Sequence, residues 1–249
     1  MKRGGSAWAW FWTVLGVLYL FLPLLATFLF SLRAKLGVLS LQAYQNILTD
    51  PDFGYSFGSS IMWAVLTIIV GVLIFVPTAY LIRLRLPAFR TPVEFITLLP
   101  FVIPVIVYVF SLVRTFSTPP LLIVDSPVVL IAAYTVVAMP YMYSAVDTGL
   151  RAIDVRTLTE AGQSLGAGWG TILFRIILPN IRVAILSGAF ITFAIVMGEL
   201  IIAQYLVKPA FAPFMAFLMQ KKAYEPAALA IISFALTWAC MGIMQFAPR

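Results

Sequence analysis

The chain has 249 residues, of which 63% are apolar and 10% are charged, whereas a soluble domain carries about 25% charged residues. This composition excludes an ordinary soluble domain, a disordered chain and a secreted disulfide scaffold. Histidine is absent and Cys240 is the single cysteine, which excludes histidine-dependent catalysis, an internal disulfide and cysteine metal sites. The sequence has no Gly-Lys pair, so a Walker A loop is also excluded.

The net charge of +7 is distributed thinly, without a basic block. A nucleic-acid partner is therefore not expected. A membrane protein with its Lys and Arg residues biased to one side explains the charge better.

Six apolar stretches are long enough to cross a bilayer core of about 30 Å, which needs roughly 20 residues in a helix. They are Ala7–Phe30, Ser60–Ile82, Phe95–Val113, Pro127–Val146, Val183–Leu206 and Ala227–Phe246. The runs are continuous rather than alternating, so we predict an all-α polytopic membrane protein with six transmembrane helices in a single domain, residues 1–249. The first stretch has 24 uncharged residues and exceeds a signal-peptide core of about 7–15 residues, so we expect it to be a retained helix.

The Lys and Arg residues predict the orientation. Ten of the 16 fall on the side that holds both termini and six fall on the other side. This excess predicts that both termini are cytoplasmic. Within the spans, Pro100 and Pro104 lie one turn apart and should bend the third helix. Between the first two spans, Leu41–Leu48 is expected to form a short amphipathic helix.

The connection from Asp147 to Arg182 is long for a simple link between membrane helices. Thr157 and Glu160 have the spacing of a capping box, in which each side chain binds the backbone N–H of the other residue. Leu158, Ala161, Gly162 and Leu165 have helical spacing and should share one face, and Gly166 should end the helix. A second amphipathic stretch, Thr171–Leu178, should follow and end at Pro179.

A helix this short is unstable alone in water. It must pack on the ends of the chain's own helices, on the lipid surface or on a partner protein. The residues themselves leave these three alternatives open.

The stretch Glu160-Ala161-Gly162-Gln163-Ser164-Leu165-Gly166, followed after nine residues by Ile176-Ile177-Leu178-Pro179, resembles the EAA loop of bacterial binding-protein-dependent ABC-importer permeases. Every spacing agrees, and Gly162 replaces the usual second alanine. The resemblance implies the type I importer permease fold, with residues 147–182 as a cytoplasmic coupling loop. The resemblance extends beyond the loop, since the polyamine (spermidine/putrescine) branch of this family is similar to Met139-Pro140-Tyr141, Leu150-Arg151-Ala152-Ile153-Asp154 and the run from there to Leu206.

The resemblance implies that the chain is a non-enzymatic permease subunit of the bacterial inner membrane, forming half of a substrate pathway. The implied partners are a second, homologous permease subunit, two ATP-binding subunits, a periplasmic or lipid-anchored binding protein, and membrane lipid. No cofactor is expected in this chain, because ATP and Mg²⁺ bind the partner ATPase. The coupling residues implied are Thr157, Glu160, Ala161, Gly162, Leu165, Gly166, Ile176, Leu178 and Pro179.

An ionisable residue within a membrane helix predicts a functional site, and Glu199 is the one formal charge within the six stretches. Helical geometry places Gly188, Thr192, Glu199 and Ala203 on one small, partly polar face, which suits a subunit interface or a water-lined pathway. We predict a pathway for a small cation such as a polyamine, lined by Glu199 and Thr192 with Tyr134 and Tyr141 adding cation–π contacts. The alternative interpretation makes Glu199 purely structural.

Other functions stay open beside this one. The same importer class also serves ferric iron, thiamine and aminophosphonates. A secondary carrier would use ion coupling within one chain, but no internal repeat is evident. An intramembrane enzyme would need a Ser-Lys or paired-Asp site, and all five lysines lie outside the spans. A pore-forming homo-oligomer would not need the loop.

Overall fold

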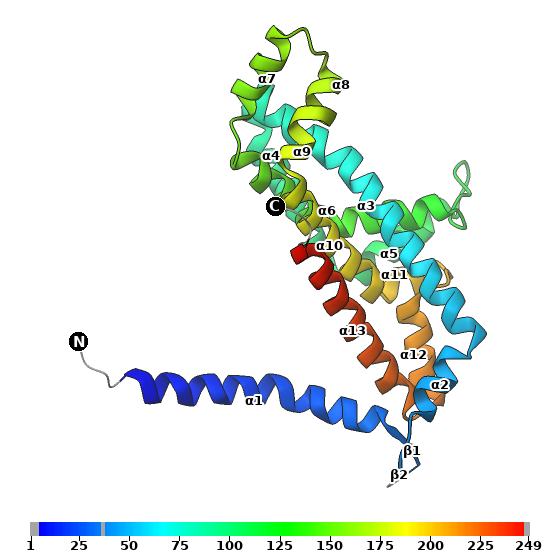
Figure 1. Ribbon diagram of the computed structural model, residues 1–249. Coiled ribbons are helices and arrows are strands. Elements are labelled where there is room, and N and C mark those ends of the chain that lie inside the picture. The colour runs from blue at the N-terminus through cyan, green and yellow to red at the C-terminus, as the bar shows by residue number, and fades with distance from the viewer. Residues whose placement is uncertain (1–4, 36–37, 247–249) are drawn as a thin grey trace. The chain divides into compact units, whose positions relative to one another are not determined.

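The computed structural model describes residues 5–35 and 38–246, and its described part is helical apart from one short antiparallel ribbon of β1 (Arg33–Lys35) and β2 (Val38–Leu39) (Figure 1). The predicted all-α class is therefore confirmed. Contacts divide the chain into two compact units, Met1–Gly54 with Met215–Ala239 and Tyr55–Phe214 with Cys240–Arg249.

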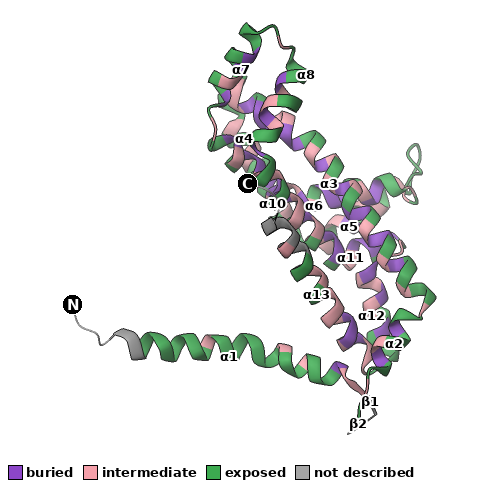
Figure 2. Ribbon diagram, in the orientation of Figure 1, coloured by how far each residue is buried: buried purple, intermediate pink, exposed green. Residues whose placement is uncertain are grey.

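The first unit contains α1 (Gly5–Ser31), α2 (Gln42–Leu48) and most of α13 (Glu225–Phe246). The predicted amphipathic helix is confirmed as α2, which buries Ala43 and Ile47. The side chain of Asn46 on α2 donates a hydrogen bond of 3.1 Å to Glu225. In contrast, the apolar side chains of α1 are largely exposed (Figure 2). Exposed apolar surface on this scale needs lipid or another helix as its neighbour.

The second unit is built around α6 (Pro127–Arg151), which packs along α10 (Arg182–Gly198) and also against α4 (Arg90–Val102). Its other elements surround these three helices. They are α3 (Pro51–Arg85), the short helix η1 (Pro87–Phe89), α5 (Val105–Phe116), α7 (Val155–Ser164), α8 (Trp169–Thr171), the π-helix η2 (Ile172–Ile177), α9 (Leu178–Asn180), α11 (Ile201–Tyr205) and the start of α12 (Phe211–Lys221).

Each of the six predicted spans is mostly helical, but two of them are interrupted, so fewer than six are straight membrane-crossing helices. Among the described residues, α1, α3 and α6 are each long and apolar enough to cross a membrane. Two bent pairs raise this number to five, namely η1–α4 with α5 at 98° and α8–α9 with α10 at 77°. The described part of α13, Glu225–Ala239, is apolar but shorter.

The predicted bend in the third span is a complete break. Helix α4 ends at Val102, Ile103 is extended (ψ 118°), and Pro104 precedes α5. Proline has no N–H to donate and forces the preceding residue out of the helical region, which accounts for the break.

The expectation of a continuous fifth helix to Leu206 is wrong. Helix α10 ends at Gly198, Glu199 has an extended backbone (ψ 116°), and α11 begins at Ile201. The Glu199 carboxylate accepts hydrogen bonds from the N–H groups of Ile201 and Ile202, at 3.0 and 2.8 Å. A side chain that caps a new helix in this way stabilises the interruption.

Two glycines allow α6 and α10 to approach closely. A Cβ atom on Gly149 would lie 2.5 Å from the Cβ of Ala184, and a Cβ on Gly188 would lie 2.8 Å from the sulfur of Met142. Gly188, Thr192 and Ala203 are all buried. The small face predicted on the fifth helix is therefore used for packing within this chain.

We predict that Gly149→Ala destabilises the fold. The new methyl group collides with the Cβ of Ala184, which no rotamer change can move. Overpacking of this kind costs about 1–3 kcal/mol, measurable as a lower thermal unfolding midpoint in detergent. Gly58→Ala is the matched control, since a Cβ there meets nothing within 4 Å and alanine favours the helix. Equal midpoints for the two variants would contradict the packing argument.

Candidate functional site

The predicted helix in the 147–182 loop is confirmed as α7, but the predicted capping box is wrong. The cap is Asp154, whose carboxylate accepts the Thr157 backbone N–H at 3.1 Å and the Thr157 hydroxyl at 2.7 Å. Glu160 pairs instead with Arg156 at 2.8 Å. The hydrogen bonds from Thr157 hold the pKa of the Asp154 carboxyl below its ordinary value, so the cap is charged at neutral pH.

The buried face of α7 differs from the predicted one. Val155, Thr159 and Gly162 are buried, whereas Ala161 is exposed. Leu165 follows the last helical residue and is 88% exposed. Of the predicted face, Gly162 is buried and Leu158 is half-buried, whereas Ala161 is exposed within the helix and Leu165 lies past its end. Gly166, at φ +78°, ends the helix as predicted.

The inner face of α7 packs on η2, which belongs to the second limb of the loop, Trp169–Asn180. A Cβ atom on Gly162 would lie 3.1 Å from both Ile172 and Ile176. Glycine at this position therefore lets the two limbs approach closely. Leu178 is half-buried and Pro179 is exposed where the chain turns toward α10.

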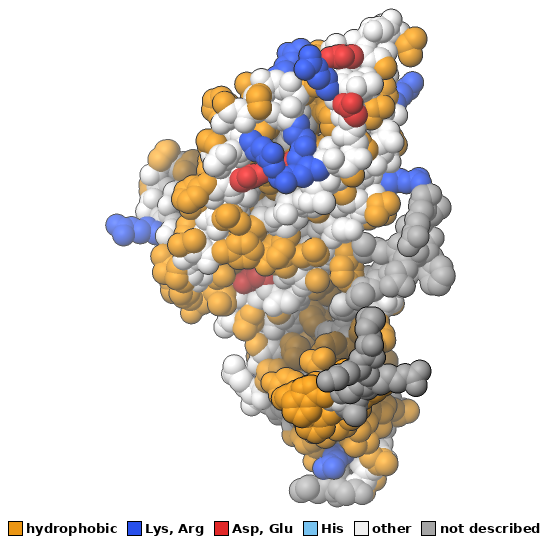
Figure 3. All heavy atoms as spheres, turned by 90° about the vertical axis from the view of Figure 1, so that its left-hand side faces the viewer, with side chains coloured by type: hydrophobic (Ala, Val, Ile, Leu, Met, Phe, Trp, Pro, Cys, Tyr) orange, Lys and Arg blue, Asp and Glu red, His pale blue; other side chains and the backbone are white. Residues whose placement is uncertain are grey.

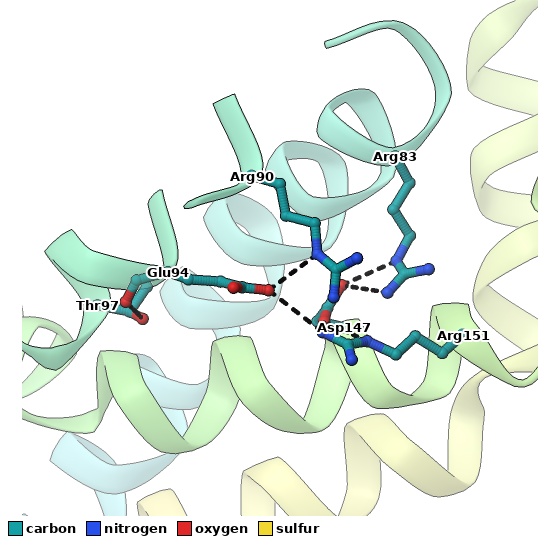
Figure 4. A network of polar contacts seen from close by, with 6 residues as sticks. All are labelled: Arg83, Arg90, Glu94, Thr97, Asp147 and Arg151. Atoms are coloured by element: carbon teal, nitrogen blue, oxygen red, sulfur yellow. Dashed lines mark hydrogen bonds and ion pairs between the residues drawn. The ribbon is translucent and has the colours of Figure 1, made fainter. Parts of the chain in front are cut away.

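A network of charged side chains joins α3, α4 and α6 near the loop (Figure 4). Asp147 is bound by Arg83 and by Arg151, both at 2.6 Å. Glu94 accepts from Arg90 at 2.9 Å and from Arg151 at 3.2 Å. The Arg90–Glu94 and Asp147–Arg151 pairs each have an i,i+4 spacing in the sequence. The other contacts join residues far apart in sequence, and no local pattern could have indicated them.

The same network borders a cavity of about 780 Å³ among α4, α6 and α10. Its lining combines charged side chains, hydroxyl groups and aromatic rings. The lining includes Glu94, Asp147, Arg151, Tyr141, Tyr143 and Ser187. Figure 3 shows charged side chains gathered toward the α7 end of the second unit, with hydrophobic side chains predominating farther from it.

The four predicted pathway residues do not share one cavity. Tyr141 lines the 780 Å³ cavity, with its ring 5.4 Å from that of Phe101. Tyr134 and Thr192 are each 1% exposed within the helix packing. Glu199 is half-buried, and its carboxylate caps α11.

These features define a polytopic α-helical membrane protein with interrupted spans and an exposed loop helix. The model of the family described as binding-protein-dependent transport system inner membrane component matches residues 76–247, and the chain belongs to this family. The membrane component is a transport subunit and not an enzyme, because ATP hydrolysis belongs to a separate subunit.

Curated relatives and solved structures agree on this class. The molybdate/tungstate transport system permease protein of Thermococcus kodakarensis is 30% identical over 76% of this chain and 78% of its own length. The spermidine/putrescine transport system permease protein of Haemophilus influenzae is 31% identical over 48% of each chain. A bacterial ABC transporter structure involved in alginate import has a TM-score of 0.72 and 17% identity, covering 100% of this chain and 98% of that chain.

We predict that Asp147→Asn destabilises the second unit. The Asp147 side chain is 8% exposed between two guanidinium groups, and removing one partner of a buried ion pair costs about 3–5 kcal/mol. The free energy of unfolding in mixed micelles measures this loss. Glu160→Gln breaks the exposed pair with Arg156 and should not change stability measurably. Wild-type stability for Asp147→Asn would contradict a structural role for the network.

Proposed function

We propose that this chain forms half of the substrate pathway of an ATP-driven importer and couples to the ATPase subunit through α7. The observation that carries the proposal is Leu165, an apolar side chain 88% exposed at the tip of a capped loop helix. An exposed large apolar side chain on a loop that the scaffold positions supports docking to a partner.

The exposed face and the buried face of the loop would have different roles. The exposed Thr157, Glu160, Ala161, Leu165 and Gly166 are available to the ATPase. The buried Gly162 and the half-buried Ile176 and Leu178 hold the two limbs together. Pro179 would fix the turn into α10. ATP and Mg²⁺ would bind in the partner, so this chain needs no cofactor.

The proposed assembly contains a second, homologous permease subunit, two ATP-binding subunits and an external binding protein. One structural neighbour is a bacterial alginate ABC transporter in complex with an alginate pentasaccharide-bound periplasmic protein, which supports the last partner. The excess of Lys and Arg supports cytoplasmic termini and a cytoplasmic α7.

The substrate proposed from the sequence is a polyamine cation. The name of the Haemophilus influenzae relative supports it, as does the carboxylate of Glu199. A small oxyanion is the second candidate, and two observations favour it. The molybdate/tungstate permease relative matches over a larger share of this chain, and the Glu199 carboxylate is engaged by the backbone N–H groups of α11.

We expect Leu165→Asp to reduce co-purification of the ATPase subunit by at least tenfold. A charge replaces the apolar side chain that would enter the partner, and burying it unpaired is costly. The measurement is the ATPase recovered with the detergent-solubilised chain from native membranes. Val207→Asp is the control, because Val207 is 84% exposed and follows α11, away from the loop. Equal recovery with both variants would sink the docking proposal.

Glu199→Gln distinguishes the two substrate classes. Uptake of labelled spermidine and of labelled molybdate is measured in proteoliposomes that contain the complete importer with its binding protein. For a cation pathway we expect spermidine uptake to fall at least tenfold, since the amide carries no charge to compensate a dehydrated amine. For a capping role the amide oxygen still accepts N–H groups, and uptake of the transported solute should change less than threefold. Unchanged spermidine uptake rules out the pathway role of Glu199.

A further inference from the structure

The C-terminal end of α3 contacts both limbs of the 147–182 loop, although the chain does not run directly from α3 into either limb. The Tyr80 hydroxyl lies 2.9 Å from the hydroxyl of Thr159 on α7. The Arg85 guanidinium lies 4.3 Å from the centre of the Trp169 ring on α8. The rings of Tyr80 and Trp169 also meet edge to face at 6.4 Å. We call Tyr80, Arg85, Thr159 and Trp169 the α3 clasp.

The direction of the central hydrogen bond follows from the hydrogens available. The Thr159 hydroxyl donates its single hydrogen to the carbonyl of Val155, at 2.6 Å. It must therefore accept from Tyr80, whose O–H is the donor. Both side chains are 2% exposed, so water does not readily replace this bond. Removing the Tyr80 hydroxyl deletes the bond and leaves the internal bond of α7 intact.

The opposite end of α3 holds the segment between α11 and α12. The Ser60 hydroxyl accepts the backbone N–H of Phe211 at 2.7 Å, and the Trp63 indole N–H donates to the carbonyl of Pro209 at 3.3 Å. Trp63 also belongs to the buried cluster that contains Ile202 and Ala203 of α11. One helix therefore contacts both the loop and the segment that follows the Glu199 interruption.

The distance between these contact points is large, and the single helix α3 spans it, with Pro77 inside the helix near Tyr80. Seventeen residues separate Trp63 from Tyr80 along the continuous helix α3, which corresponds to about 26 Å at 1.5 Å per residue. The loop is linked covalently to α6 through Ala152–Asp154 and to α10 through Ile181. A displacement of α7 reaches those helices through the chain itself. Helix α3 has no chain connection to the loop and follows α7 through noncovalent contacts, which are the clasp and the apolar cluster that holds Val76 of α3 with Val155 and Ile172 of the loop.

We propose that α3 carries the movement of α7 to the α11–α12 segment, and that Tyr80 is the positioning residue that engages α3 with the loop. The inference rests on the proposed coupling of α7 to an ATPase. It adds a route through α3 to the two routes that the chain connections already provide. The contact of Arg85 with Trp169 attaches the second limb of the loop to the same end of α3.

The test is hydrogen–deuterium exchange of the assembled transporter in nanodiscs, with and without Mg-ATP plus vanadate. In the wild type we expect nucleotide to change exchange both in residues 155–166 and in residues 207–214. In Tyr80→Phe the change in residues 155–166 should persist, because docking is untouched. The change in residues 207–214 should fall about fivefold, the factor expected for losing one hydrogen bond.

Tyr44→Phe is the matched control. It removes another hydroxyl–hydroxyl bond, of 2.7 Å to Ser31, in the first unit. We expect both nucleotide-dependent changes to survive in this variant. Arg85→Lys gives a second, independent variant on an exposed side chain: it keeps the charge, loses the planar stacking on Trp169, and should reduce the change in residues 207–214 in the same direction.

The outcomes separate the two proposals. A wild type in which residues 155–166 do not respond to nucleotide overturns the coupling function, and the clasp with it. A wild type in which only residues 155–166 respond overturns the clasp alone. An undiminished response of residues 207–214 in Tyr80→Phe also overturns it. A third outcome is that Tyr80→Phe does not assemble, whereas Arg85→Lys assembles and residues 207–214 respond to nucleotide as in the wild type. The clasp would then be a contact needed for folding only, and the proposal would be overturned.

Discussion

The close approach of α6 and α10 is the constraint on which the second unit depends. Without side chains at Gly149 and Gly188, the two helices pack closely at both positions. Small residues serve this purpose in membranes, where lipid is as apolar as leucine and tight packing must hold helices together. Because the 147–182 loop leaves from α6 and returns to α10, this packing also fixes the separation of the two loop ends.

Charged groups in the second unit are placed where they cost least. The Arg83–Asp147–Arg151 contacts and the Glu94 pairs lie at the ends of α3, α4 and α6, where the arginine stems can reach the aqueous boundary. Glu199 lies inside a predicted span, and its carboxylate is satisfied by the N–H groups of α11. The half-buried carboxylate is thus hydrogen-bonded where it has lost water, and the same bonds stabilise the start of α11 after the break.

Composition and periodicity were sufficient to predict the helical spans, the amphipathic α2 and the glycine stop at Gly166. They failed where a tertiary or side-chain interaction decides the local structure. Asp154 and Thr157 are both suitable N-cap residues for this helix, and the helix begins after Asp154, three residues before Thr157. The break at Glu199 needs a side chain to turn back onto the backbone ahead of it, which hydropathy does not report. The Asp147 contact with Arg83 and the Tyr80–Thr159 bond join residues more than 60 positions apart, and a single sequence contains no local pattern that indicates them.

Gly162 has a consequence for exchanging loops between importers. On the other limb, side-chain atoms of Ile172 and Ile176 lie so close that a Cβ at this position would crowd both, at 3.1 Å. A loop helix that carries alanine at this position is therefore suited to a different second limb. Chimeras that graft only the first limb would inherit a mismatch, whereas grafting both limbs together would preserve the fit as one interchangeable module. Gly162, Ile172 and Ile176 therefore fit one another as a set, because a substitution at one of these positions limits the side chains that the other two positions tolerate.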